Sequence, residues 1–509
     1  MSSPPPSRRA AAATTFATNA ANIGLGALQS IILLPYFIRY LGKGLYGSWL
    51  SSGDVLAWIQ AVDLGLPGIL TQRIGAAHGR GDEVDIGRWL FSGVISLGAV
   101  AAFVVWASYA VAPRLPQWFK VPAEQAASFE LTFQIAAIAT AGIIMQYVAV
   151  GFARGTQRTA FMGLLMALSS PVGFVVTLVM LLHGFGLPSI AWGMLARSTV
   201  LIVGSAYFLF SSMTPAMFRG FRFDAAVMRE TSRLMPVTAL GGLSYAAMNQ
   251  SEFAIIGFML DPALATGYLA TRRASDVGRA VADAIAYGTY GSFAHLVTSE
   301  QRANSIAVYN EVVSIRTSFA VALAGAYIAM NASFVAAWVG PGLYGGTQLT
   351  LLLALSSVVG GGAFLTNYLY RATGAVAEGS IASAVEAVVR IGLMVWLVSV
   401  IGVPGIPLAS LVTASVFGVL AYRWSISRLR PFATEDDRVD VRVWAARISF
   451  LVLAVAVGHS VRIADWIAAA MIGGTFGAVG LVGLVAIDTR AGAIRTMAAN
   501  LVRKARTPW

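Results

Sequence analysis

The chain contains no cysteine and few charged residues, and each shortage excludes a class of protein. Without a Cys among its 509 residues, it has no disulfide, no thiolate nucleophile and no cysteine metal site. Only 11% of the residues are charged and 57% are hydrophobic, whereas an ordinary soluble domain has about 25% charged residues. The four histidines have no second ligand at metal-binding spacing. We therefore expect no metal site and no cofactor.

The chain also has little sequence outside its apolar runs. The longest polar connections are about 213–230 and 428–441, too short for a soluble catalytic domain. No P-loop, nucleotide fingerprint or nucleophile elbow lies in a strand-to-helix context. We therefore expect that the chain is not an enzyme and does not drive transport with its own ATP site.

Long apolar segments dominate the chain, and each is long enough to cross a bilayer. Because backbone groups in hydrocarbon must bond within their own segment, and the runs are too long for barrel strands, we predict helices. The expected fold is an all-α polytopic membrane protein with about 14 transmembrane helices. The predicted spans are 14–38, 45–72, 86–112, 126–151, 158–183, 187–212, 231–260, 262–295, 304–330, 346–370, 379–402, 405–427, 442–460 and 463–487.

The distribution of Lys and Arg predicts the orientation. An even number of spans places both termini on one side, and most basic residues outside the spans lie on that side. The positive-inside rule then predicts that both termini are cytoplasmic. The net charge of +12 is explained by this bias, so we expect no nucleic-acid partner.

The two halves of the chain resemble each other at an offset of about 220 residues. An even number of spans per unit makes the repeat parallel, which predicts two six-helix lobes and a C-terminal helix pair. Three matches support this: Tyr46 with Tyr268, Trp118 with Trp338, and Gly186-Leu187-Pro188 with Gly405-Ile406-Pro407. The predicted organisation is a disordered cytoplasmic N-terminus (1–13), an N-lobe (14–212), a cytoplasmic linker (213–230), a C-lobe (231–427), a cytoplasmic loop (428–441), the helix pair (442–487) and a basic cytoplasmic tail (488–509).

The span 262–295 carries five charges in its middle, Arg272, Arg273, Asp276, Arg279 and Asp283. On a helix, all of them except Arg273 share one face, together with Tyr268, Tyr287 and Tyr290. A charge at mid-membrane costs about 2.5 to 3.5 kcal/mol on the insertion scale, so this face must line a protein interior or a watery cavity.

Two interpretations of these charges stay open. The i,i+4 spacing of Arg272 with Asp276, and of Arg279 with Asp283, allows the helix to neutralise much of its own charge. Alternatively, the surplus of arginine presents a cation-rich wall to an anionic ligand, because the guanidinium fork suits phosphate oxygens and tyrosine rings suit sugars.

Other ionisable residues are scattered over the predicted spans. Glu252, beside Asn249 and Gln250, is a candidate for ion coupling, with an ordinary polar contact between helices as the alternative. Asp63 is a second candidate, but it cannot share one site with Asp54 because the two lie on opposite helix faces. The remaining in-membrane ionisable residues are Arg197, Arg316, Glu386 and Arg390, the last two at a spacing that predicts a structural pair.

One polar connection mixes aromatic and basic residues. Between residues 217 and 223, three phenylalanines alternate with Arg219 and Arg222. This pattern is typical of a segment that lies at an anionic membrane surface, and a solvated linker is the alternative.

Several short patterns occur in order through most of the chain. They are Leu34-Pro35-Tyr36, Tyr40-Leu41-Gly42, Tyr46-Gly47, Asp63-Leu64-Gly65-Leu66 ahead of Arg73, Asn249-Gln250 with Glu252, Ile256-Gly257, Gly267-Tyr268, and Phe334 with Trp338-Val339-Gly340. In their order and spacing they resemble the polysaccharide-transporter family, the Wzx-type flippases of the MATE/MOP superfamily. One residue departs from the family pattern, since Glu252 stands where aspartate is expected.

The resemblance implies a V-shaped bundle in the bacterial inner membrane. Such a protein moves an undecaprenyl-pyrophosphate-linked oligosaccharide, the repeat unit of O-antigen, capsule or exopolysaccharide, to the periplasmic leaflet by alternating access. Its expected partners are this lipid-linked oligosaccharide, membrane lipid, H⁺ or Na⁺ as coupling ion, and a polysaccharide polymerase. A peptidoglycan lipid-precursor flippase and a cation-coupled multidrug exporter are the alternatives.

Within that expectation, each residue of span 262–295 has a role. Arg272, Arg273 and Arg279 contact the headgroup or the sugar. Asp276 and Asp283 hold the arginines and bind sugar hydroxyls, and Tyr268 and Tyr287 add hydroxyls and flat faces.

Overall fold

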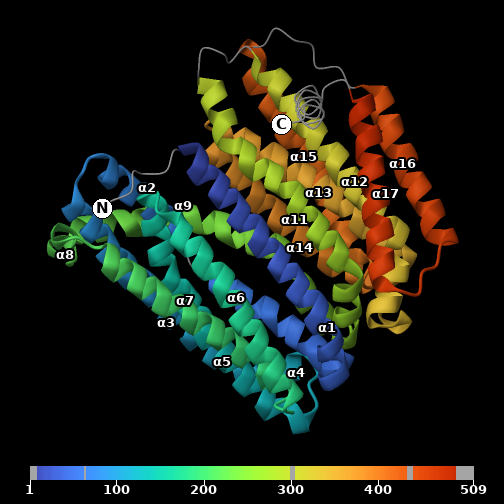
Figure 1. Cartoon of the computed structure of the whole chain (residues 1–509), viewed down its shortest axis with the longest axis horizontal. Helices are drawn as coiled ribbons and strands as arrows, with labels where there is room; N and C mark the ends of the chain where they lie inside the picture. The colour runs from blue at the N-terminus through green and yellow to red at the C-terminus, as the bar shows by residue number, and fades with distance from the viewer. Residues whose placement is uncertain (1–7, 62–64, 299–303, 433–439, 489–509) are drawn as a thin grey trace, which may run out of the picture. The chain divides into compact units, whose positions relative to one another are not determined.

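The computed structural model describes residues 8–61, 65–298, 304–432 and 440–488. Side chains are described from residue 24 onward, except 236–239, 287, 291, 292 and 432. The described part of the chain contains helices and connections but no strand (Figure 1). The prediction of an all-α protein is confirmed.

Within these ranges, seventeen α-helices are joined by short turns and three 3-10 segments. They are α1 (Arg8–Gln60), α2 (Leu66–Gly79), α3 (Glu83–Val111), α4 (Leu115–Trp118), α5 (Ala123–Gly155), α6 (Thr159–Leu182), α7 (Pro188–Ser212), α8 (Pro215–Gly220), α9 (Ala225–Asn249), α10 (Glu252–Met259), α11 (Pro262–Thr298), α12 (Ser305–Val339), α13 (Gly346–Ala372), α14 (Val376–Ile401), α15 (Gly405–Leu429), α16 (Val441–Ser460) and α17 (Trp466–Ile487).

Eleven of the described helices are long and apolar enough to cross a membrane. This number is consistent with about 14 predicted spans. Helix α1 contains the first predicted span and most of the second, so it is counted once. The seventh span is divided between the more polar α9 and the short α10, and α11 carries five charges, so neither is counted. The chain is therefore a multi-pass membrane protein.

Three predicted boundaries are wrong in detail. Helix α1 begins at Arg8, inside the segment predicted to be disordered. The predicted connection between spans 14–38 and 45–72, in contrast, agrees with the structure, because α1 consists of two helices that meet at a kink at the non-helical Gly42 (φ 77°, ψ 158°). The predicted span 45–72 is divided, because α1 ends at Gln60 and α2 starts after Gly65, whose φ of 66° is left-handed. The predicted span 231–260 is divided between Asn249 and Glu252.

The helices form two compact units, Met1–Ala265 and Thr266–Trp509. This division counts α9 and α10 with the first unit, where α10 packs on α1. The sequence repeat instead assigns 231–260 to the C-lobe, so the six-helix lobes stay a prediction.

In the first unit, α5 is the central helix, and it packs against α2, α3 and α7. Its large aromatic side chains, Phe129, Phe133 and Phe152, are fully buried. Because acyl chains are as apolar as these rings, the rings stabilise the unit in lipid mainly through close van der Waals packing between helices.

In the second unit, α12 is the central helix, with α13 and the pair α16–α17 packed around it (Figure 1). A buried polar network fixes the pair to α12. Arg447 on α16 lies 3.2 Å from the Asp488 carboxylate at the end of α17, and its Nη2 donates to the hydroxyls of Ser314 and Ser318 on α12 at 2.7 and 2.9 Å. Arg447 and Asp488 are both almost fully buried. Each charge therefore depends on its partners, because an unpaired ion inside the bundle would carry its full desolvation cost.

One local contact recurs in both units. Ser48 donates to the carbonyl of Phe119 at 2.8 Å, and Thr271 reaches the carbonyl of Leu343 at 3.5 Å. In each case the hydroxyl also bonds a glycine carbonyl four residues earlier. The acceptor Phe119 directly follows Trp118, and Leu343 lies five residues after the matched Trp338. This recurrence is consistent with the predicted parallel repeat.

Candidate functional site: the charged helix α11 and its neighbours

Helix α11 holds the first predicted ion pair. The Nε of Arg272 donates to Asp276 Oδ2 at 2.8 Å, so the i,i+4 prediction is confirmed for this pair. The Arg272 guanidinium also lies over the ring of Tyr268, with Cζ 5.6 Å from the ring centroid. Tyr268 is itself buried. The tyrosine therefore contacts the arginine by its face, a cation–π geometry that holds the guanidinium in place.

The backbone next to Arg272 is fixed by α12. The carbonyl of Thr271 accepts hydrogen bonds from the Tyr327 hydroxyl at 2.8 Å and from the Asn331 amide at 3.1 Å. The Thr271 hydroxyl in turn accepts from the backbone N–H of Gly345 at 2.8 Å. These bonds tie the start of the charged region to α12 and to the loop before α13, so Arg272 projects from a rigid position.

Asp283 pairs across to the neighbouring helix. Its Oδ1 lies 3.1 Å from Nη2 of Arg316 on α12, a partner that i,i+4 spacing did not predict. The guanidinium of Arg316 also donates to two backbone carbonyls of α13, Val358 at 2.6 Å and Ser357 at 3.3 Å. Only 1% of the Arg316 side chain is exposed, against 19% for Asp283. The pair therefore joins α11, α12 and α13 inside the second unit.

A glycine makes room for this pair. A Cβ on Gly361 of α13 would lie 1.5 Å from Nη2 of Arg316 and 2.7 Å from Oδ1 of Asp283. No side chain fits between such atoms without displacing them. The guanidinium of Arg316 consequently occupies a notch in α13 that exists because residue 361 is glycine.

A small cavity lies beside Arg316. It measures about 10 Å³, and its polar lining consists of Ser275, Arg279, Arg316, Tyr327 and Ser357. This is room for about one water molecule. A diphosphate or a sugar does not fit in it, so a ligand of that size would have to reach α11 along its partly exposed side chains, which include Arg272, Arg273, Asp276 and Asp283.

Two of the predicted site residues lie outside the described part. The side chain of Tyr287 is not described, and Asp63 falls in the segment 62–64. Tyr290, on the same predicted face, packs against Tyr368 of α13 with ring centroids 4.5 Å apart. Its ring therefore takes part in the packing of α11 on α13.

The predicted coupling residue Glu252 lies at a break between helices. Ser51 and Asp54 of α1 bond the first residues of α10, with Asp54 Oδ2 accepting from the Ala254 N–H at 3.0 Å. Trp58 donates to the Ser251 hydroxyl at 3.0 Å. Asp54 is buried, and a carboxylate at a helix N-terminus is stabilised by the helix dipole. The sequence alone does not indicate this role of Asp54, although the polar run 249–251 is a signal for a helix break.

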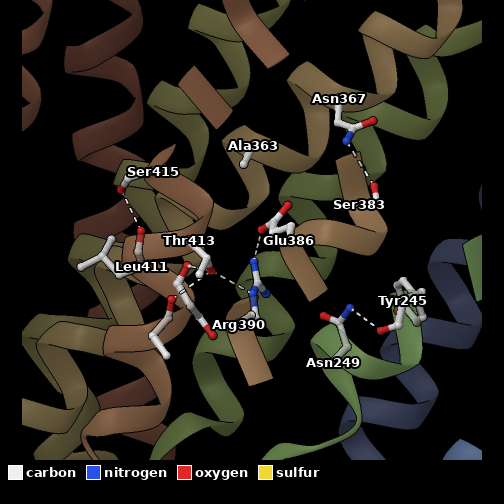
Figure 2. Close-up of polar contacts among 12 residues, drawn as sticks. Tyr245, Asn249, Ala363, Asn367, Ser383, Glu386, Arg390, Leu411, Thr413 and Ser415 are labelled. Atoms are coloured by element: carbon white, nitrogen blue, oxygen red, sulfur yellow. Dashed lines mark hydrogen bonds and ion pairs between the residues drawn. The ribbon is translucent and has the colours of Figure 1, made fainter. Parts of the chain in front are cut away.

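A separate group of polar contacts joins α13, α14 and α15 (Figure 2). Glu386 and Arg390 form the predicted ion pair, and Arg390 Nε also donates to the Thr413 hydroxyl at 3.1 Å. Asn367 donates to Ser383 at 3.2 Å. In each of these contacts both partners belong to α13, α14 or α15, which agrees with the structural role predicted for the Glu386–Arg390 pair. Among the described residues, no group of three His, Asp or Glu side chains is arranged to hold a metal ion.

Comparison with solved structures identifies the fold. The chain is similar to a MATE multidrug resistance transporter of the MOP superfamily in its inward-facing form (TM-score 0.60, 16% identity, 79% of this chain and 95% of that chain covered) and in its outward-facing form (0.61, 16%, 82% and 96%). It is equally similar to a MOP superfamily transporter from Pyrococcus furiosus, for which reverse polarity of the binding pocket suggests a different function (0.59, 16%, 82% and 96%). No family model matches the chain, and neither does any curated protein. The chain therefore has the fold of MATE transporters.

Proposed function

We propose that the chain is a membrane transporter that flips an undecaprenyl-pyrophosphate-linked oligosaccharide across the bacterial inner membrane by alternating access, coupled to H⁺ or Na⁺. One observation carries this proposal. At membrane depth, α11 and α12 together contain four arginines, Arg272, Arg273, Arg279 and Arg316, and three acidic residues, Asp276, Asp283 and Glu311. The formal surplus on these two helices is 4 − 3, or one positive charge.

The sign of this surplus suits an anionic substrate. A pyrophosphate diester is a dianion, and arginine forms paired, charge-assisted hydrogen bonds with phosphate oxygens. The two ion pairs hold Arg272 and Arg316 in place, and the guanidinium groups nearest to solvent would meet the diphosphate. The lipid tail remains in the bilayer, so a cavity large enough for the whole molecule is not required.

The alternatives differ in the charge of the cargo. A cation-coupled multidrug exporter is supported by the multidrug resistance transporters that share the fold, but a cationic drug would meet a net positive wall. The Pyrococcus furiosus transporter supports the idea that this fold accommodates pockets of opposite polarity. A peptidoglycan-precursor flippase shares the diphosphate, and only the sugar distinguishes its substrate.

The test replaces Arg272 and Arg279 singly, each with Ala and with Lys. The four variants are made in cells that depend on the chain for surface polysaccharide. Loss of a charge-assisted hydrogen bond costs about 1.5 to 3 kcal/mol, so we expect the Ala variants to lower export by about tenfold or more. Lys keeps the charge without the fork and should restore part of the export. Arg423→Ala, at an exposed position on α15, is the matched control.

The outcomes separate the candidates. Normal polysaccharide in all four variants, with wild-type amounts of protein in the membrane, would refute the role of these arginines. Efflux of a cationic dye by the wild type, abolished by the same changes, would favour the drug exporter. Export that persists in Glu252→Gln without dependence on an ion gradient would support Glu252 as the coupling residue, with Asp63→Asn as the parallel variant.

A further inference from the structure

The connection between α7 and α9 carries an exposed surface that the proposed transport does not use. We define it as the aromatic collar, made of Phe218, Arg219, Phe221, Arg222 and Phe223. All five side chains are exposed, and the phenylalanines are exposed by 48%, 37% and 63%. Three exposed rings within six residues are too many for a solvated loop, because each exposes apolar area to water.

The collar is held rigidly on the start of α3. Met217 and Gly220 face α3 and are buried, and a Cβ on Gly220 would lie 2.0 Å from the Val84 carbonyl oxygen. The Thr214 hydroxyl donates to Glu83 at 2.8 Å, and Phe91 of α3 meets Phe221 edge to face at 5.3 Å. This packing buries one side of the segment against the protein and leaves Phe218 and Phe223 exposed.

The charges of the collar are also available. No ion pair joins Arg219 or Arg222 to another residue in the described ranges, whereas the neighbouring Arg80 pairs with Asp85 and Arg88 pairs with Asp224. Acidic side chains near the collar are therefore committed to other partners: Glu83 to Thr214, Asp85 to Arg80 and Asp224 to Arg88.

The position of the aromatic collar relative to the membrane surface follows from where α7 ends. This helix is long and apolar enough to span a membrane, and it ends at Ser212, directly before the collar. In its last two turns, Tyr207 and Phe210 are exposed by 67% and 68%. Exposed aromatic rings at the end of a span are typical of the boundary between acyl chains and headgroups. The collar therefore begins at the level of the headgroups.

We propose that the aromatic collar binds the anionic lipid headgroups of the leaflet on its side of the membrane, with its phenylalanine rings inserted among the upper acyl chains. Arg219 and Arg222 contact lipid phosphates, and Phe218 and Phe223 enter the apolar region below. A basic residue near an anionic surface contributes about 1 kcal/mol of attraction, which is about fivefold in association per arginine. The proposal is independent of the transported substrate.

The test uses the absence of native cysteine, which gives each single-cysteine variant one label position. Phe218→Cys and Phe223→Cys are made separately in the full chain, labelled with a nitroxide and placed in nanodiscs of phosphatidylcholine with or without phosphatidylglycerol. Accessibility to oxygen, which concentrates in the bilayer, is compared with accessibility to an aqueous nickel complex. His78→Cys, an exposed polar position in the last turn of α2, is the aqueous control.

We expect the ratio of oxygen to nickel accessibility at both collar positions to exceed the control severalfold, and to rise further with phosphatidylglycerol. In the Phe223→Cys background, Arg219→Gln with Arg222→Gln should abolish the rise, whereas Arg80→Gln should leave it, because Arg80 is already paired. Added salt should reduce the rise, since exposed charges are screened.

Three results would overturn the proposal. The collar labels are as accessible to nickel as the His78 control, which indicates a solvated loop. Alternatively, neither reagent reaches them, which indicates a protein partner or a packed interface. Finally, insertion is the same in both lipid compositions and in the double glutamine variant, which removes the role of anionic headgroups.

Discussion

The notch at Gly361 gives the sharpest prediction about the second unit. Replacing this glycine with alanine places a Cβ 1.5 Å from the Arg316 guanidinium and 2.7 Å from the Asp283 carboxylate, so the ion pair must move or break. Breaking a buried ion pair costs about 3 to 5 kcal/mol. Partial movement of the arginine and the 19% exposure of Asp283 reduce this cost, and we expect Gly361→Ala to destabilise the folded protein by about 2 to 3 kcal/mol.

The neighbouring glycine is a matched control. A Cβ on Gly360 meets nothing within 4 Å, and alanine is favoured over glycine inside a helix by about 0.5 to 1 kcal/mol. Gly360→Ala should therefore leave stability unchanged or raise it. The two substitutions differ by one position in α13 and should have opposite signs.

The assay is reversible unfolding of the purified protein in mixed micelles, followed by tryptophan fluorescence. A second background, Arg316→Met, removes the guanidinium and should cancel most of the cost of Gly361→Ala. The reasoning fails if Gly361→Ala and Gly360→Ala have the same stability, or if the cost of Gly361→Ala persists without the arginine.

Two further substitutions test the other buried charges by the same unfolding measurement. Asp54→Asn removes the carboxylate at the start of α10 and should destabilise the fold by about 1 to 2 kcal/mol, more than Asp261→Asn at the exposed start of α11; equal effects would contradict a special role of the buried cap. Arg447→Met leaves Asp488 buried without its cation and should cost about 3 to 5 kcal/mol, whereas adding Asp488→Leu should recover most of it; a double variant as unstable as the single one would contradict the pairing argument.

The sequence predicts the local part of this structure well. The pairs Arg272–Asp276 and Glu386–Arg390 follow from spacing on one helix, because residues four apart are neighbours on its surface. The all-α fold follows from the length of the apolar runs, since only closed backbone bonding is tolerated in lipid.

The pairing of Asp283 with Arg316 could not be predicted in the same way. The two residues are 33 positions apart, and their contact depends on which faces of α11 and α12 meet. The sequence does mark Arg316, because it is a charge inside an otherwise apolar span, but several in-membrane acids were equally plausible partners. The role of Gly361 could not be predicted either, because it depends on how α12 and α13 pack against each other.

The helix breaks could be predicted only in part. Gly65, followed by Leu66 and Pro67, is a recognisable helix start, yet the apolar run across it suggested one continuous span. At Gly42 the predicted connection between two spans agrees with the structure, because two helices meet there at a kink with a non-helical backbone (φ 77°, ψ 158°). Hydropathy reports burial in lipid and is insensitive to a local change of backbone direction.

The attachment of α16 and α17 has a mechanical consequence. Their main packing is with α12, and the Arg447 network grips that helix at Ser314 and Ser318, on either side of Arg316 along the chain. A lipid or protein that displaces α16 and α17 therefore also exerts force on α12, the helix that carries the Arg316 guanidinium. Through α12, forces that the surrounding bilayer exerts on α16 and α17 would therefore reach the buried Arg316 guanidinium.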